Sequence, residues 1–63
     1  MEKIDLNLAY IFGQQRFIAK KSCIPVQDQK LTDLLKPVKE HKNRVKIYKA
    51  WYAGYTSQII DFF

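Results

Sequence analysis

The sequence is poor in residues that cross-link or bend a chain, with one cysteine, two glycines and two prolines among 63 residues. The single Cys23 excludes an intrachain disulfide and any zinc site built from several cysteines. A lone cysteine is also typical of a reducing compartment, so we expect a cytoplasmic protein. No apolar run approaches the roughly 20 residues of a membrane span. No signal peptide is apparent, because Asp5 and Asn7 interrupt the apolar residues after Met1.

Acidic residues are also scarce, with six against eleven Lys and Arg, which gives a formal net charge of +5. Ten of the basic residues lie between Arg16 and Lys49, and only Asp28, Asp33 and Glu40 oppose them there. A positive field of this strength on so small a body favours polyanions or acidic protein surfaces as partners. The central part of the chain is where we expect such a partner to bind.

The few glycines and prolines divide one domain, residues 1–63, into short segments. Asp28 is a predicted helix N-cap, Pro37 ends one helix and allows the next to begin, and Gly54 is a predicted residue just beyond a helix end. The pattern predicts an all-α bundle of three to four helices, at about 5–21, 29–36, 38–53 and 57–63. A chain of this length buries little surface alone, so we expect a homodimer.

The N-terminal segment allows a second interpretation. Ile4, Leu6, Leu8, Tyr10 and Phe12 alternate with other residues, as in a strand, and Gly13-Gln14 would then form a turn. This alternative is an α+β fold, with an N-terminal β-hairpin packed on helices. The helical interpretation fits the full length better, because apolar residues recur every three to four positions and Lys20-Lys21 stand at the end of the segment.

On the long helix, the helical period separates aromatic from basic residues. A predicted core seam contains Val38, His41, Val45, Tyr48 and Tyr52. Ile47 and Trp51 widen the apolar side on one flank of the seam, and Trp51, at its edge, is a candidate for exposure. A continuous lysine stripe runs beside the seam and consists of Lys39, Lys42, Lys46 and Lys49. No acidic residue interrupts this stripe.

The lysine stripe suggests contact with the phosphates of nucleic acid, DNA in particular. The predicted nucleic-acid-binding residues are Lys39, Lys42, Arg44, Lys46 and Lys49. Asn43 and Arg44 are candidates for reading base edges, as are Gln14, Gln15 and Arg16 if they are exposed. The leading functional hypothesis is therefore a small regulatory protein of a microbe, phage or plasmid, acting in transcription or another DNA-linked process.

The alternative hypothesis is a protein-binding inhibitor or adaptor that docks on a larger regulatory protein. Apolar residues beyond those needed for a core would form the partner or dimer surface, namely Leu6, Tyr10, Phe17, Trp51, Phe62 and Phe63. If residues 5–21 are a helix, Leu6, Tyr10 and Phe17 form a second apolar stripe on it, and a helix apolar on two sides is buried on two sides.

Nothing in the sequence indicates catalysis. His41 is expected to pack on the core seam, and Cys23 to be a small buried thiol, although Lys20 and Lys21 nearby would lower its pKa if they contacted it. No metal-ligand spacing, glycine-rich phosphate loop or paired-carboxylate pattern is present. We expect no enzyme activity, cofactor, metal or small-molecule substrate.

Overall fold

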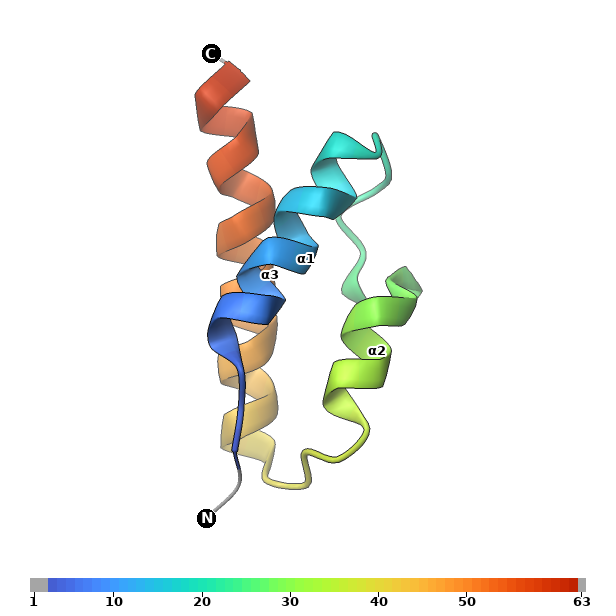
Figure 1. The fold of residues 1–63 in the computed structure, drawn as a ribbon, viewed down its shortest axis with the longest axis vertical. Coiled ribbons are helices and arrows are strands. Elements are labelled where there is room, and N and C mark those ends of the chain that lie inside the picture. Colours follow the sequence, from blue (N-terminus) through green and yellow to red (C-terminus); the bar gives the residue numbers. More distant parts are fainter. Residues whose placement is uncertain (1–2, 63) are drawn as a thin grey trace.

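A computed structural model describes residues 3–62, with side chains for residues 3–60, and all regular secondary structure within that range is helical. Three α-helices and one 3-10 turn follow each other: α1 (Leu6–Ile18), η1 (Pro25–Gln27), α2 (Gln29–Leu35) and α3 (His41–Phe62). In Figure 1, α1 lies across α3, and α2 packs beside them with the opposite direction. The all-α prediction is confirmed. The hairpin alternative is wrong, because residues 6–18 form a helix that packs along α3.

Helix α1 has defined caps at both ends. The Asp5 carboxylate accepts a hydrogen bond from the backbone N–H of Leu8, at 2.9 Å, and this begins the helix. At the other end Lys20 adopts the left-handed conformation, with φ of 59°. The N–H groups of Lys20 and Lys21 then donate back to the carbonyls of Phe17 and Arg16, the pattern of a Schellman motif. The predicted helix 5–21 is therefore three residues too long at its C-terminus.

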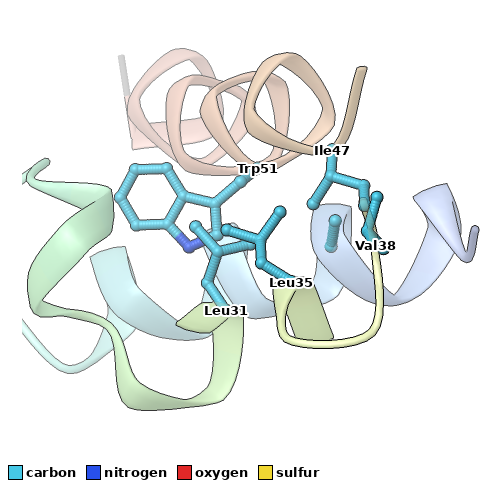
Figure 2. Close-up of a cluster of buried hydrophobic side chains, with 6 residues drawn as sticks. Leu31, Leu35, Val38, Ile47 and Trp51 are labelled. Atoms are coloured by element: carbon cyan, nitrogen blue, oxygen red, sulfur yellow. The ribbon is translucent and has the colours of Figure 1, made fainter. Parts of the chain in front are cut away.

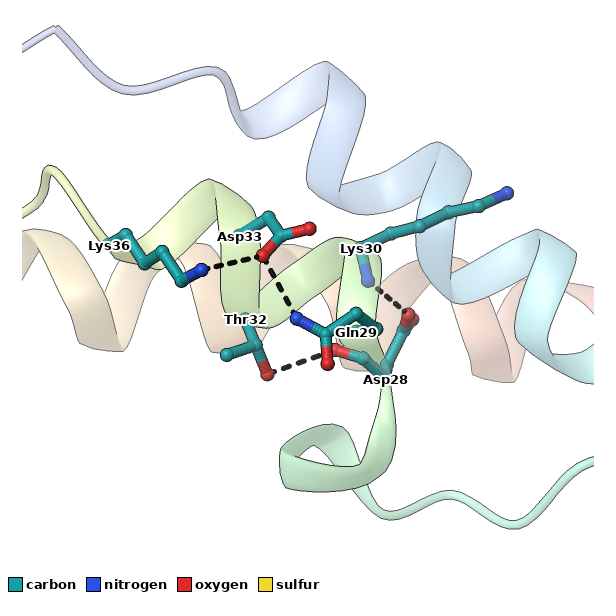
Figure 3. A network of polar contacts seen from close by, with 6 residues as sticks. All are labelled: Asp28, Gln29, Lys30, Thr32, Asp33 and Lys36. Atoms are coloured by element: carbon teal, nitrogen blue, oxygen red, sulfur yellow. Dashed lines mark hydrogen bonds and ion pairs between the residues drawn. The ribbon is translucent and has the colours of Figure 1, made fainter.

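Helix α2 begins at Asp28, as predicted. The Asp28 side chain accepts from the backbone N–H of Lys30, and the Thr32 hydroxyl donates to the Asp28 carbonyl, at 3.1 Å each (Figure 3). Further along the same helix, the carboxylate of Asp33 accepts a hydrogen bond from Gln29 and pairs with Lys36. Both contacts lower the pKa of Asp33, the Gln29 bond most. The helix ends two residues before Pro37, close to the predicted limit.

Helix α3 spans two segments that were predicted to be separate helices, divided at Gly54. It is 22 residues long and continues through Gly54 without a break, so the predicted helices 38–53 and 57–63 are one helix. Gly54 has no positive φ, and it therefore does not serve as a helix-ending residue. It is buried, and its Cα lies against the backbone of Tyr10. The glycine is needed for close packing between helices.

The crossing of α1 and α3 is close because glycine occupies both sides of it. A Cβ added to Gly54 would overlap the carbonyl oxygen of Tyr10, and a Cβ added to Gly13 would overlap that of Trp51. One turn before each glycine stands an alanine, Ala9 on α1 and Ala50 on α3. Small residues spaced by four on both helices let the two backbones approach each other.

The core lies between this helix pair and α2. Its buried members are Ala9, Leu31, Leu35, Val38, Ile47 and Trp51 (Figure 2). Of the predicted core seam, only Val38 is a member. His41 is exposed and Tyr52 is 42% exposed, whereas Trp51, expected at an exposed edge, is completely buried.

The face of α3 that packs inward is therefore rotated from the predicted one. It runs through Asn43, Ile47, Trp51 and Gly54, at spacings of four, four and three residues. The physical reason is the crossing: Gly54 must face α1, and Ile47 and Trp51 share its side of the helix. The prediction ranked the faces of the helix by side-chain hydrophobicity, which gives no weight to a glycine. It therefore chose the neighbouring face, which contains Tyr48 and Tyr52, as the one that packs inward.

A buried hydrogen bond connects α3 to the start of α2. The indole N–H of Trp51 donates to the second carboxylate oxygen of Asp28, at 2.8 Å, and Asp28 is only 7% exposed. Tyr55 extends this contact region, because its ring stacks on Trp51 at 5.7 Å and its hydroxyl donates to the Lys21 carbonyl. One carboxylate thus caps α2 and positions the largest core side chain.

Replacing either glycine by alanine should destabilise the fold. Alanine is intrinsically better in a helix by about 1 kcal/mol, but the added Cβ forces the helices apart, and overpacking typically costs about 1–3 kcal/mol. We expect Gly13→Ala and Gly54→Ala to lower the free energy of unfolding in urea, measured by circular dichroism. The matched control is Ala53→Gly at an exposed position of α3, which should cost about 1 kcal/mol from helix propensity alone. A stabilised Gly54→Ala variant would contradict the close crossing.

The Asp28–Trp51 bond can be tested by a double-mutant cycle. Asp28→Ala removes the cap of α2, about 1 kcal/mol, and leaves a buried indole N–H without its acceptor, about 1–3 kcal/mol. In a Trp51→Phe background only the cap is lost, so the cost of Asp28→Ala should fall to about 1 kcal/mol. Urea unfolding followed by circular dichroism measures both. Equal costs in the two backgrounds would show that the bond contributes nothing.

Candidate nucleic-acid interface

Three lysines share the outer face of α3. Lys42, Lys46 and Lys49 are exposed and follow each other at spacings of four and three residues. At about 100° per residue, each lies roughly 100–160° around the helix from Ile47, on the side away from the core. They span about 10 Å along the helix axis. This part of the predicted stripe therefore forms one continuous surface, named here the basic face (Lys42, Lys46 and Lys49).

Lys39 does not belong to the basic face. It is exposed, but it lies in the segment between α2 and α3, because α3 begins only at His41. The predicted helix began at residue 38 and placed Lys39 one turn before Lys42. Three lysines, instead of four, are thus held in helical register.

Arg44 is used inside the fold. Its Nη1 donates to the carbonyls of Leu35 and Val38, at 3.1 and 2.8 Å, and the residue is half-buried. The guanidinium joins the end of α2 to the segment that follows it, because the Leu35 carbonyl, which also accepts from the Val38 backbone N–H, is the last of the helix, and the Val38 carbonyl lies three residues beyond. The sequence signal for this role was the position of an arginine a few residues beyond a helix end, and the stripe interpretation missed it. Asn43, another candidate for base reading, is 9% exposed.

The charge of the basic face is not neutralised within the fold. Between His41 and Ile60 the helix contains four basic residues and no acidic one. In the part of the chain that the structure describes, Lys42, Lys46 and Lys49 form no ion pair, and the carboxylate of Asp33 pairs with Lys36 on α2. The face therefore presents three unshielded ammonium groups to solvent.

Tyr52 adds an exposed aromatic ring beside the lysines. It is 42% exposed, it follows Lys49 by three residues, and its ring packs edge-on against the buried Trp51 at 5.3 Å. Tyr48, one turn earlier, is half-buried. An exposed ring next to cations is a feature of surfaces on which unpaired bases stack. The sequence assigned Tyr52 to the core and so missed it.

The residues predicted for a partner or dimer surface do not gather into one patch. Leu6 is exposed on the first turn of α1, Tyr10 is half-buried against Gly54, and Trp51 belongs to the core. Phe17 is half-buried, with its ring edge-on to Tyr55 at 5.3 Å. The side chain of Phe62, and Phe63 as a whole, lie outside the described residues. Trp51 is therefore removed from the candidate surface by its burial.

The structure contains an apolar groove that the sequence analysis did not predict. It has a volume of about 500 Å³ and is lined by Phe17, Ile18, Lys20, Lys21 and Tyr55. Ile18, at its edge, is 64% exposed. The groove joins the end of α1 to the C-terminal half of α3, so two segments far apart in the sequence form it. We name it the apolar groove below.

The two residues considered for chemistry are both at the surface. His41 is exposed at the first position of α3, which corrects its predicted place in the core. Cys23 is exposed as well, and partial desolvation raises the pKa of its thiol, so the lysines before it do not activate it. Among the described residues no group of three or more His, Cys, Asp and Glu side chains is placed to hold a metal ion.

Comparisons with protein families, curated proteins and solved structures found no match to this chain. Within the described residues, no helix combines the length and the hydropathy that a membrane span requires.

Proposed function

We propose that the protein binds nucleic acid, DNA in particular, through the basic face of α3. The observation that supports this is the display of three unpaired lysines on the outer side of the longest helix, without an intervening acid. A regulatory role in transcription or another DNA-linked process is the finer part of the proposal. This regulatory role rests on the small size of the protein and its net charge of +5, the same two features from which the sequence analysis predicted it.

Lysines on one helix face favour a particular mode of binding. Three ammonium groups spread over about 10 Å of a helix can contact neighbouring phosphates, which supplies affinity without sequence selection. Base reading needs Arg, Asn or Gln side chains aimed at base edges, but Asn43 and Arg44 are held toward the interior. We therefore expect binding with little preference for base sequence.

Neutralising three phosphates should give a specific salt dependence. The slope of log K against log salt concentration should be about −2.7 for duplex DNA, measured by fluorescence anisotropy with a labelled duplex. Replacing Lys46, the central lysine, by Glu should reduce the slope by about 1 or more, because a phosphate contact is lost and repulsion is added. Circular dichroism should show an unchanged fold, since Lys46 is exposed.

The matched control for Lys46→Glu is Lys3→Glu. Lys3 is also exposed but lies before α1, far from α3 in sequence. Both variants change the net charge equally, so a difference between them reports the position of the charge. If the two variants lose equal affinity, the basic face has no special role and only net charge matters. A labelled single strand, tested in parallel, should bind at least as well as the duplex if Tyr52 stacks on bases.

A second candidate function is binding of an acidic segment of a partner protein, and the apolar groove favours it. Phe17, Ile18 and Tyr55 supply apolar surface, while Lys20 and Lys21 supply positive charge at the same groove. A segment with apolar residues flanked by Asp or Glu is complementary to both. A second copy of this chain also has a net charge of +5 and is therefore less complementary to the lysines of the groove. The predicted homodimer is the competing explanation of the groove.

The groove can be tested with a labelled peptide that alternates Leu or Phe with Glu, and its Lys-containing counterpart. We expect the acidic peptide alone to bind, and Ile18→Ser to weaken it severalfold by removing apolar contact. Ile60→Ser is the control, because Ile60 is similarly exposed, at 74%, but does not line the groove. If light scattering instead shows a dimer that Ile18→Ser dissociates, the groove binds a second copy and the acidic-partner proposal is wrong.

A further inference from the structure

A second, smaller cavity lies on the opposite side of α1 from Phe17. It has a volume of about 110 Å³ and is formed by the C-terminal half of α1, the segment that follows it and the first turn of α2. Three of its lining side chains are cationic, namely Arg16, Lys21 and Lys30, and Gln15 adds an amide. These residues come from separate segments of the sequence, and the fold brings them to one place.

The cavity holds more positive than negative charge. Its one carboxylate, Asp28, is committed to the fold, because one oxygen accepts from the Lys30 backbone and the other from the Trp51 indole. Over the described part of the chain, none of the three cationic side chains forms an ion pair. Three like charges around a small cavity repel one another, so the arrangement favours an anion between them.

Two of the cations are also held in position. Arg16 donates from Nε to the Ser22 carbonyl at 3.0 Å, and more weakly from Nη1 and Nη2 to Gln27. These bonds use three of the five N–H groups of a guanidinium, and two remain for a ligand. The Lys30 ammonium donates to the Gln15 amide oxygen at 3.1 Å and lies 5.9 Å from the centre of the Phe12 ring. A site built in advance loses less entropy when it binds.

We infer that this cavity binds the phosphate group of a small molecule or nucleotide, between Arg16, Lys21 and Lys30. Arginine with lysine is the combination that best matches phosphate oxygens, since the planar guanidinium binds two oxygens and the ammonium groups add point charges. The volume admits one such group and little more. None of the three residues belongs to the basic face of α3, so the inference does not depend on the proposed nucleic-acid function. Lys21 also lines the apolar groove, whereas Lys30 does not, so Lys30 is the lysine that reports on this cavity alone.

The test is a titration of the ¹⁵N-labelled protein with inorganic phosphate, with sodium chloride at equal ionic strength as the reference. We expect saturable chemical-shift changes at Gln15, Lys21 and Lys30 with phosphate only. Thymidine 5′-monophosphate is a second probe, and binding at least tenfold tighter than phosphate identifies a nucleotide as the source of the group. Similar affinities identify free phosphate as sufficient. Equal changes with chloride, or changes confined to α3, would overturn the inference.

Substitution of single lysines completes the test. Lys21→Gln and Lys30→Gln should each weaken phosphate binding by about tenfold, because each removes one charge-assisted contact. Lys20→Gln is the matched control: it is the neighbouring lysine and is also exposed, but it does not line this cavity. Arg16→Gln would also remove the hydrogen bonds of Arg16 to Ser22 and Gln27 and so disturb the fold. The two lysine variants are therefore the ones that test phosphate binding. Wild-type affinity in both lysine variants would show that the cavity is not the site.

Discussion

The close approach of α1 and α3 is the constraint on which the rest of the structure depends. Gly13 and Gly54 each lie against the backbone of the opposite helix, at a distance that leaves no room for a Cβ. This contact determines which side of α3 faces inward, and it places Ile47 and Trp51 in the core. Trp51 in turn reaches Asp28 and so fixes the start of α2. Six apolar side chains are buried among the described residues, as expected of so short a chain, and the close packing of the two backbones adds contact area to this small core.

The same constraint determines what α3 shows to solvent. With Gly54 turned toward α1, the lysines at 42, 46 and 49 are directed outward and Tyr52 is left partly exposed. Had the helix been rotated to bury Tyr48 and Tyr52, Trp51 would be exposed, but about 140–180° around the helix from the three lysines. The candidate interface is thus a consequence of helix packing, and its composition is read correctly only after the inward face is known.

Sequence reasoning succeeded where a single residue has one dominant effect on its neighbours. Asp28 caps α2 and Pro37 limits it, so the limits of that helix were predicted to within a residue. It failed where the effect depends on a partner distant in the sequence. Gly54 has the local signature of a helix end, and only the backbone of Tyr10 shows why the helix continues. Trp51 was assigned to the surface for the same reason, because its partner Asp28 lies 23 residues away. The approach of Lys21 and Lys30 to Arg16 at the smaller cavity also depends on the path of the chain between α1 and α2, which no periodicity describes.

The basic residues of this protein divide by type in a way that supports a functional use of the lysines. Both arginines, Arg16 and Arg44, donate to backbone carbonyls and hold the segments on either side of α2. A guanidinium suits this work, because its several N–H groups point in fixed directions. Lys21, Lys42, Lys46 and Lys49 make no such contact among the described residues. Solubility alone would be served by a smaller net charge, and acidic residues near the lysines would stabilise the helices further. No acidic residue lies on α3 between His41 and Ile60, and Asp28 is the one carboxylate at the cavity of Arg16, Lys21 and Lys30. This excess of positive charge is the common ground of the two proposals that assign an anionic ligand to the protein.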